Sequence, residues 1–360
     1  MNRLGGLDGV RGMAVTLVIL FHVLPLPFYF GWIGVQIFFV LSGFLITRLL
    51  LELRGRPFGS YLKTFYMRRV LRIFPVYYLY LAVVAIVIAI MFASNVALRA
   101  DLKRVAAQLP YAVTYTYNAF HATSAWTLEP TMAHLWSLAA EEQFYILWPL
   151  LVYKLSRRLL GVVVVCLVVA GPILRLAQYW FAVAAPDIFG RPEMAVYVSP
   201  VSHIDAFATG AFLAIFAIRG KVTALYLAFA ISIAAALGPV FTGISRTTLY
   251  VFEMPDGWQF VWGYTVINIL SLMLVKGAME GSLFPRLLNH RWATHVGRVS
   301  YGMYLFHYPI ATLLMVPLPS LTYLQKVGFA GVVFVVTFIF ADLSFRYFES
   351  RVLSLKSRYM

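Results

Sequence analysis

Cysteine and charge are both scarce in this sequence. The 360 residues include one cysteine, Cys166 in the apolar run VVVVCLVVA, so a disulfide framework or a cysteine metal site within the chain is excluded. We expect Cys166 to be a small buried apolar residue. Charged residues make up 12% of the sequence and hydrophobic residues 62%, against about 45–50% apolar in a soluble domain. The chain is therefore predicted to be a polytopic integral membrane protein.

Acidic residues are the scarcest charged group, with 14 Asp and Glu against 29 Lys and Arg. A net charge of +15 could indicate a nucleic-acid partner, but the basic residues fall in short loops between apolar runs rather than in one solvated domain. We therefore expect no nucleic acid. Most of the basic residues lie on one side of the predicted membrane topology, and this bias places both termini in the cytosol.

Ten apolar stretches are long enough to span a membrane. They lie near residues 10–28, 32–50, 73–93, 134–153, 159–181, 201–219, 222–241, 258–276, 299–317 and 323–343. The first stretch lacks a small-residue cleavage site, so we interpret it as a retained span rather than a signal peptide. No internal repeat is visible. The prediction is an all-α protein with one transmembrane domain over 1–360, a core of about 5–345 and a short basic cytosolic tail, 346–360.

The first span, LDGVRGMAVTLVILFH, carries three ionisable candidates, Asp8, Arg11 and His22. Arg11 and His22 are eleven residues apart, roughly three helical turns, so both side chains share one helix face about 16 Å apart. With Arg11 at the membrane surface, His22 lies near the middle of the bilayer, where an ionisable group indicates a functional site. The alternative is a snorkelling arginine and a core histidine with satisfied hydrogen bonds.

Three arginines open the third span, Arg68, Arg69 and Arg72. Arg69 and Arg72 have i,i+3 spacing, so their guanidinium groups share a helix face and could bind one polyphosphate from the cytosolic side. A cluster that only sets the topology explains the same residues without a ligand.

The fourth span begins with HLWSLAAEEQ. His134, Ser137 and Glu141 lie on one helix face at i, i+3 and i+7, while Glu142 points about 100° away. Adjacent carboxylates in a transmembrane helix must be paired, protonated or hydrated. Glu141 and Glu142 either neutralise arginines of other helices or orient the reacting groups.

Further polar residues lie at the other end of the bundle. His203 and Asp205 stand at the far-side mouth of the sixth span, where Asp205 is either a helix cap or a functional residue. Tyr301, Tyr304 and His307 form an i,i+3,i+6 stripe along the ninth span, which could equally be internal packing. The far-side loop of about 94–133 is rich in aromatic residues, including His121 and Trp126, which act either as interfacial anchors or as surfaces that stack on sugars.

Six segments occur in the order, and at roughly the spacing, of the membrane-bound acyltransferase family 3, which the chain resembles over nearly its whole length. They are LDGVRGMAVTLVILFH, GWIGVQIFFVLSGFLIT, RRVLRIFP, HLWSLAAEEQFYILWP, the Asp205 segment and SYGMYLFHYPI. The resemblance implies a ten-helix enzyme of the bacterial cytoplasmic membrane. Its motifs map onto Arg11 with His22, Arg69 with Arg72, and Glu141 with Glu142. His203 departs from the family pattern, which has an arginine at this place.

The implied activity is transfer of an acyl group, most often acetyl from acetyl-CoA, to a hydroxyl of an envelope carbohydrate such as O-antigen or exopolysaccharide. A small glycosylated or macrolide acceptor is an alternative, and a proton-coupled secondary transporter is a second one.

Acyl-CoA is expected to bind through arginines on the cytosolic side. His22 then serves either as general base, with Glu141 or Glu142 supporting the imidazole, or as an acyl relay. No metal is expected. Some members of the family carry a soluble hydrolase-like domain that this sequence lacks, so we expect either an acceptor that reaches the membrane core or a separate periplasmic protein that completes transfer.

Overall fold

The computed structural model of the chain describes residues 6–24, 28–94, 99–216, 259–315 and 322–356, and a few positions between 218 and 231. Within these ranges the chain is helical and contains no strand. The helices are α1 Leu7–Val23, α2 Ile33–Leu53, α3 Phe58–Ala93, α4 Arg99–Val113, α5 Tyr117–His121, α6 Leu135–Lys154, α7 Arg157–Ala184, α8 Pro192–Val198, α9 Ile204–Ile215, α12 Gln259–Met279, α13 Pro285–Leu288, α14 Arg291–Arg298, α15 Ser300–Met315, α16 Tyr323–Ser344 and α17 Ser350–Ser354, with short 3₁₀ turns Phe28–Trp32 and Val201–His203 and a π-helix, Phe345–Glu349.

The all-α prediction agrees with the structure, whereas the count of ten spans stays a prediction. Among the described residues, five helical segments are long and apolar enough to cross a membrane, and a sixth appears if the α8–α9 pair, bent by 62°, forms one span. The five are Phe30–Leu53, Phe58–Ala93, Arg157–Ala184, Val261–Met279 and Tyr323–Ser354. The expected stretch 222–241 lies almost entirely outside the described residues. The other nine expected stretches each coincide with a helix, although α1, α9 and α15 are shorter than a full span.

Helix α2 is the centre of the bundle. It packs against α1, α3, α6, α9 and α12, most extensively against α9. The α2–α9 crossing is close because glycines face backbone on both sides: a Cβ on Gly43 would lie 2.0 Å from the carbonyl oxygen of Phe207, and one on Gly210 would lie 2.0 Å from that of Val40. Small residues at such crossings let membrane helices approach closely.

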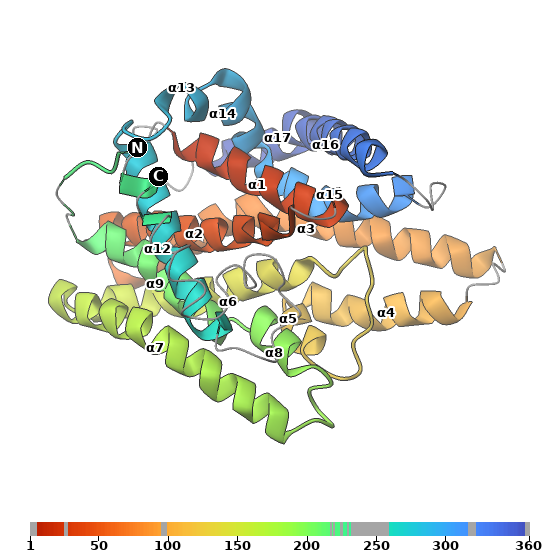
Figure 1. Ribbon diagram of the computed structural model, residues 1–360, viewed down its shortest axis with the longest axis horizontal. Helices are drawn as coiled ribbons and strands as arrows, with labels where there is room; N and C mark the ends of the chain where they lie inside the picture. The colour runs from red at the N-terminus through yellow and green to blue at the C-terminus, as the bar shows by residue number, and fades with distance from the viewer. Residues whose placement is uncertain are drawn as a thin grey trace.

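The outer faces of the bundle are apolar, as a lipid-facing surface must be. Helices α7 and α16 lie on opposite outer sides in Figure 1. Their exposed side chains include Val162, Val165, Val169 and Ile173 on α7 and Val332, Val335, Ile339 and Phe340 on α16. Cys166 belongs to this outer face of α7 and is exposed. The prediction that it is buried was wrong, because an apolar run in a membrane helix does not tell contact with lipid from contact with protein.

The shorter helices α5 and α8 pack on each other, α5 also packs on α6, and α8 on α7. Helix α5 lies beside the middle of α6, where the side-chain amides of Asn118 and Gln143 hydrogen-bond to each other. The polar side chains of α1, α3, α6 and α15 point between the helices, and they form the site described next.

Candidate active site

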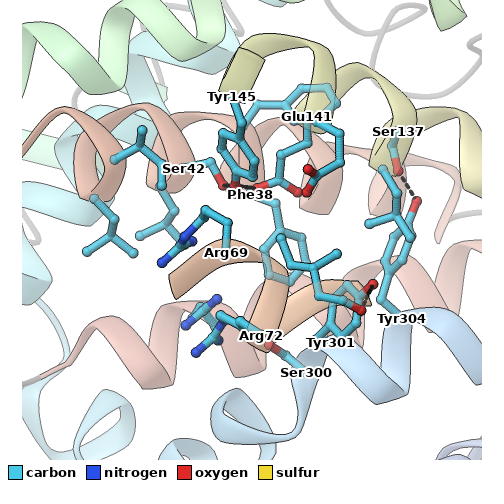
Figure 2. A pocket seen from close by; sticks show the side chains of 18 of the residues that line it. Phe38, Ser42, Arg69, Arg72, Ser137, Glu141, Tyr145, Ser300, Tyr301 and Tyr304 are labelled. Carbon is cyan, nitrogen blue, oxygen red and sulfur yellow. Dashed lines mark hydrogen bonds between the residues drawn. The ribbon is translucent and has the colours of Figure 1, made fainter. Parts of the chain in front are cut away.

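Three arginines from two helices line one cavity inside the bundle. Arg11 comes from α1, and Arg69 and Arg72 come from α3, whose i,i+3 spacing places both on the face toward the cavity as predicted (Figure 2). Within the described residues, no hydrogen bond or ion pair within 4 Å holds any of the three guanidinium groups. The Nε atom of Arg69 is buried without a partner, and its Cζ atom lies 5.9 Å from the centre of the Tyr145 ring. Unpaired guanidinium groups in a closed space favour an anionic ligand.

Helix α6 supplies two carboxylates, Glu141 and Glu142, to the same cavity. Glu141 accepts hydrogen bonds from the hydroxyl groups of Ser42 on α2 and Tyr145 on α6, which fix its orientation (Figure 2). Glu142 reaches the cavity despite its position 100° around the helix, and it also lines a neighbouring pocket with Gln143. The cavity walls therefore carry three arginines and two glutamates.

Lys356 adds a further positive charge near the arginines. It follows α17, which packs against α3, and its side chain is half-buried. Burial, together with the positive charges of Arg72, Arg69, Arg68 and Arg11, lowers the pKa of Lys356 from its usual value of 10.5 to about 7. The arginines that contribute to this lowering are positive charges, which favour an anionic ligand near them. Arg68 itself does not line the cavity.

A second cavity of about 460 Å³ lies beside the first. Two residues, Val35 and Tyr304, line both. The Tyr304 hydroxyl donates to the backbone carbonyl of His134 at 3.0 Å and lies 2.5 Å from Ser137 Oγ. These bonds hold the tyrosine between the cavities. Both His134 and Ser137, which sequence spacing placed on one helix face, are thus at this boundary.

His22 and His134 line the second cavity with an aromatic set. The remaining lining includes Trp32, Trp126, Trp136, Tyr197, Tyr308 and the basic residues His121 and Arg191. Arg11 and His22, predicted on one face of α1, therefore open into adjoining spaces at different depths.

Hydrogen bonds define the tautomer of His22. Its Nδ1 atom lies 2.9 Å from the carbonyl oxygen of Val18, which can only accept, so Nδ1 carries the proton. The same atom lies 3.2 Å from Nε2 of His307, whose own Nδ1 donates to the carbonyl of Tyr304 at 2.6 Å. His307 Nε2 is therefore an acceptor for the Nδ1 proton of His22. This arrangement leaves Nε2 of His22 unprotonated, without a hydrogen-bond partner among the described residues.

The carboxylates do not contact His22, contrary to the expectation that Glu141 or Glu142 supports the imidazole. Glu141 is seven residues, about 10 Å, further along α6 than His134, so it lies at the depth of Arg11 rather than of His22. The orienting partner of His22 is His307 instead.

Asp205 lies away from both cavities. It forms a bidentate ion pair with Arg175 of α7, at 2.9 and 3.0 Å, and accepts from Thr265 Oγ1 at 2.7 Å. Both charged side chains are fully buried. The capping alternative was wrong, because His203 rather than Asp205 is the residue before α9.

His203 accepts from Gln36 at 2.9 Å and donates to the Tyr197 carbonyl at 2.7 Å. Asp8 lies in the first turn of α1, where its backbone meets Gly297 of α14.

Two residues that line the first cavity, Ser42 and Tyr145, were not candidates from the sequence, and neither was Lys356 near the arginines. No spacing rule connects Ser42 to Glu141, because they are 99 positions apart. Tyr145 was accessible to sequence reasoning, since it is i,i+4 from Glu141. Lys356 lay in the segment interpreted as a cytosolic tail.

Guanidinium groups that can bind an anion, next to a histidine whose ring is oriented by hydrogen bonds, form a site that can carry out group transfer. A family model described as an acyltransferase domain, that of acyltransferase family 3, matches residues 4–346, and the chain belongs to this family. It is 27% identical over 361 residues to the O-acetyltransferase OatA of Staphylococcus aureus strain NCTC 8325 / PS 47, covering 97% of this chain and 57% of that protein. It is 29% identical over 367 residues to the peptidoglycan O-acetyltransferase OatA of Listeria monocytogenes strain EGD-e, covering 96% and 55%. The chain thus spans little more than half the length of these relatives. No solved structure matches it.

Proposed function

We propose that this protein is an O-acetyltransferase of a bacterial cytoplasmic membrane that transfers acetyl from acetyl-CoA to a hydroxyl of an envelope glycan. The observation that supports this most is the pair of adjoining cavities, one with three unpaired guanidinium groups and one with the free Nε2 of His22. Membership in an acyltransferase family favours this enzyme over a proton-coupled transporter.

The donor binds with its phosphates at Arg11, Arg69 and Arg72, because guanidinium groups form bidentate hydrogen bonds with phosphate oxygens. Lys356 adds a further cation near that cluster. The pantetheine arm extends along the first cavity and brings the thioester to Tyr304, where the second cavity begins.

His22 acts as the general base. Its Nε2 takes the proton of the acceptor hydroxyl while the hydroxyl oxygen attacks the thioester carbonyl carbon. The carbon–sulfur bond then breaks, the acetyl ester forms, and the CoA thiolate recovers the proton from the imidazolium. Two hydrogen bonds from His22 Nδ1, to the Val18 carbonyl and to His307 Nε2, hold the ring in the tautomer with an unprotonated Nε2, which this step needs.

The acyl-relay route uses the same nitrogen, with Nε2 attacking the thioester and the acetyl-imidazole then transferring to the hydroxyl. Mixing the protein with acetyl-CoA in the absence of acceptor and quenching within milliseconds separates the routes. An acetyl-imidazole on the peptide that contains His22, found by mass spectrometry, supports the relay, and its absence supports general-base catalysis.

The acceptor class is proposed from one relative, a peptidoglycan O-acetyltransferase. We therefore propose peptidoglycan, or another envelope polysaccharide, as the acceptor, ahead of small glycosylated or macrolide molecules. The test is transfer of labelled acetyl from acetyl-CoA by the purified protein in lipid nanodiscs to peptidoglycan fragments, exopolysaccharide and a macrolide.

In this assay His22→Ala is expected to lower transfer by about 10²- to 10⁴-fold, the usual contribution of a general base. His290→Ala, which removes a histidine at the start of α14, is the matched control. Near-normal transfer by a well-expressed His22→Ala protein, or no transfer to any glycan by the unmodified protein, contradicts the proposal.

A further inference from the structure

His121 is a buried histidine whose ring nitrogens have no hydrogen-bond partner among the residues that the structure describes. It ends α5, its side chain lines the second cavity, and it is 5% exposed. Neither Nδ1 nor Nε2 is bonded to any residue that the structure describes. A buried polar group without a partner is unfavourable, so its presence beside a cavity indicates a ligand that supplies the missing bond.

The indole of Trp126 stacks on this imidazole, with ring centres 3.7 Å apart and planes at 21°. A chain of hydrogen bonds fixes the indole: Trp126 Nε1 donates to the Tyr117 hydroxyl at 3.2 Å, which donates to Gln108 Oε1 at 2.6 Å. Gln108 in turn donates to the carbonyl of Thr127 at 3.2 Å. Trp126 and His121 therefore form a rigid pair, and preorganised side chains of this type bind ligands at low entropic cost.

The charge state of His121 fits a hydroxyl ligand. Burial, and secondarily the positive charge of Arg191, lowers the pKa of His121 to about 3, so the ring is neutral at physiological pH. A neutral imidazole has one donor nitrogen and one acceptor nitrogen. A sugar hydroxyl likewise donates and accepts, so each can bond the other in either tautomer.

Aromatic side chains form much of the wall of the second cavity, and they suit the apolar faces of a pyranose. Its volume of about 460 Å³ lies within the roughly 300–1,000 Å³ of small-molecule sites. His22 lines the same cavity, so a sugar bound there presents a hydroxyl to the proposed base.

We propose that the second cavity binds one pyranose unit of the glycan acceptor, with the sugar against Trp126 and a hydroxyl hydrogen-bonded to His121. This inference rests on the proposed function and adds its acceptor site. His121 binds and positions the acceptor and takes no part in proton transfer.

The test is steady-state kinetics in lipid nanodiscs with acetyl-CoA and the disaccharide N-acetylglucosaminyl-N-acetylmuramic acid as acceptor. His121→Phe keeps an aromatic ring against Trp126 and removes both nitrogens, and His290→Phe is the control. We expect His121→Phe to raise the KM for the disaccharide about tenfold, with the KM for acetyl-CoA within twofold of the unmodified value. An unchanged acceptor KM, or an equal rise in both constants, overturns the proposal.

A binding measurement keeps the inference distinct from the proposed function. Saturation-transfer NMR with the disaccharide alone, without acetyl-CoA, reports acceptor binding whether or not transfer occurs. A signal that is present in the unmodified protein and lost in His121→Phe supports the site even if no acetyl is transferred, in which case only the proposed function fails. If His121→Phe does not accumulate, His121→Leu is used, which also removes both nitrogens, and an unchanged signal in that variant overturns the inference.

Discussion

Nδ1 of His22 lies 3.2 Å from Nε2 of His307, and a backbone carbonyl on its own helix fixes each ring. Two neutral histidines from α1 and α15 therefore form an ordered pair in which the second orients the first. The catalytic role proposed for His22 makes His307 a positioning residue.

Replacing His307 by Phe keeps a ring in the packing but removes the acceptor for the Nδ1 proton of His22. We expect kcat to fall about tenfold or more while the KM for acetyl-CoA is unchanged. Because the two histidines act as a unit, the double variant with His22→Ala should be no slower than His22→Ala alone. Independent, multiplicative losses in the double variant would show that His307 acts by another route.

Replacing Arg69 and Arg72 together by Lys keeps both charges but removes the planar forks that bind phosphate bidentately. The affinity for acetyl-CoA, measured by calorimetric titration in detergent, should fall about tenfold or more. The control is Arg48→Lys, because Arg48 pairs with Glu52 on the exposed face of α2. An affinity equal to that of the control would assign Arg69 and Arg72 to topology alone.

The pKa of Lys356, lowered to about 7, predicts that donor binding depends on pH. In the free protein the ammonium loses its proton as the pH rises through 7, whereas bound phosphates favour the charged form and raise this pKa. The affinity for acetyl-CoA should therefore fall as the pH increases from 6.5 to 8.5, and binding at pH 7.5 should take up protons. The second ionisation of a phosphate monoester has a pKa near 6, so it is largely complete over this pH range and contributes little to the predicted pH dependence.

Calorimetry in buffers of different ionisation enthalpy measures this proton uptake. Lys356→Arg stays charged at every pH used, so it should bind with little pH dependence and no uptake. If the affinity of Lys356→Arg for acetyl-CoA falls with pH as steeply as that of the unmodified protein, another group is responsible for the titration.

Replacing Asp205 by Asn leaves the Arg175 guanidinium buried with no counter-charge. Breaking a fully buried ion pair in this way costs about 3–5 kcal/mol, so the variant should melt at a clearly lower temperature. The double variant Arg175→Met with Asp205→Leu should recover much of this loss. The KM for acetyl-CoA of folded Asp205→Asn should be unchanged. An unaltered melting temperature, followed by intrinsic fluorescence in detergent, would contradict the structural role.

The positive-inside bias predicts that Arg11, Arg69 and Arg72 lie on the cytosolic side, and CoA is too charged to cross the bilayer. Protein reconstituted in one orientation in sealed vesicles should therefore use labelled acetyl-CoA from one face only. The loop of about 94–133 should be accessible to protease from the other face. Equal transfer with donor on either face would show that the topology or the assignment of the donor arginines is wrong.

Local periodicity explains which parts of the site could be predicted from the sequence. The shared faces of Arg69 with Arg72, and of Ser137 with Glu141, follow from residues on one helix, where spacing determines direction. The pairing of His22 with His307 joins residues 285 positions apart, and no helical rule contains that contact. Arg175 was an isolated arginine within a predicted span and Asp205 a lone acid in another, so a search for paired charges could have joined them. The exposure of Cys166 could not be predicted either, because hydropathy does not separate lipid-facing from buried positions.

The boundary formed by Val35 and Tyr304 between the two cavities bears on the energy supply of the cell. An enzyme that transfers acetyl across a membrane needs an opening for a two-carbon group, but an open channel would also pass protons and dissipate the ion gradient. Tyr304, held by Ser137 and the His134 carbonyl, lines both cavities, so its position controls how wide the connection between them is. Under the proposed function, keeping this connection narrow lets acetyl transfer proceed without dissipating the membrane potential.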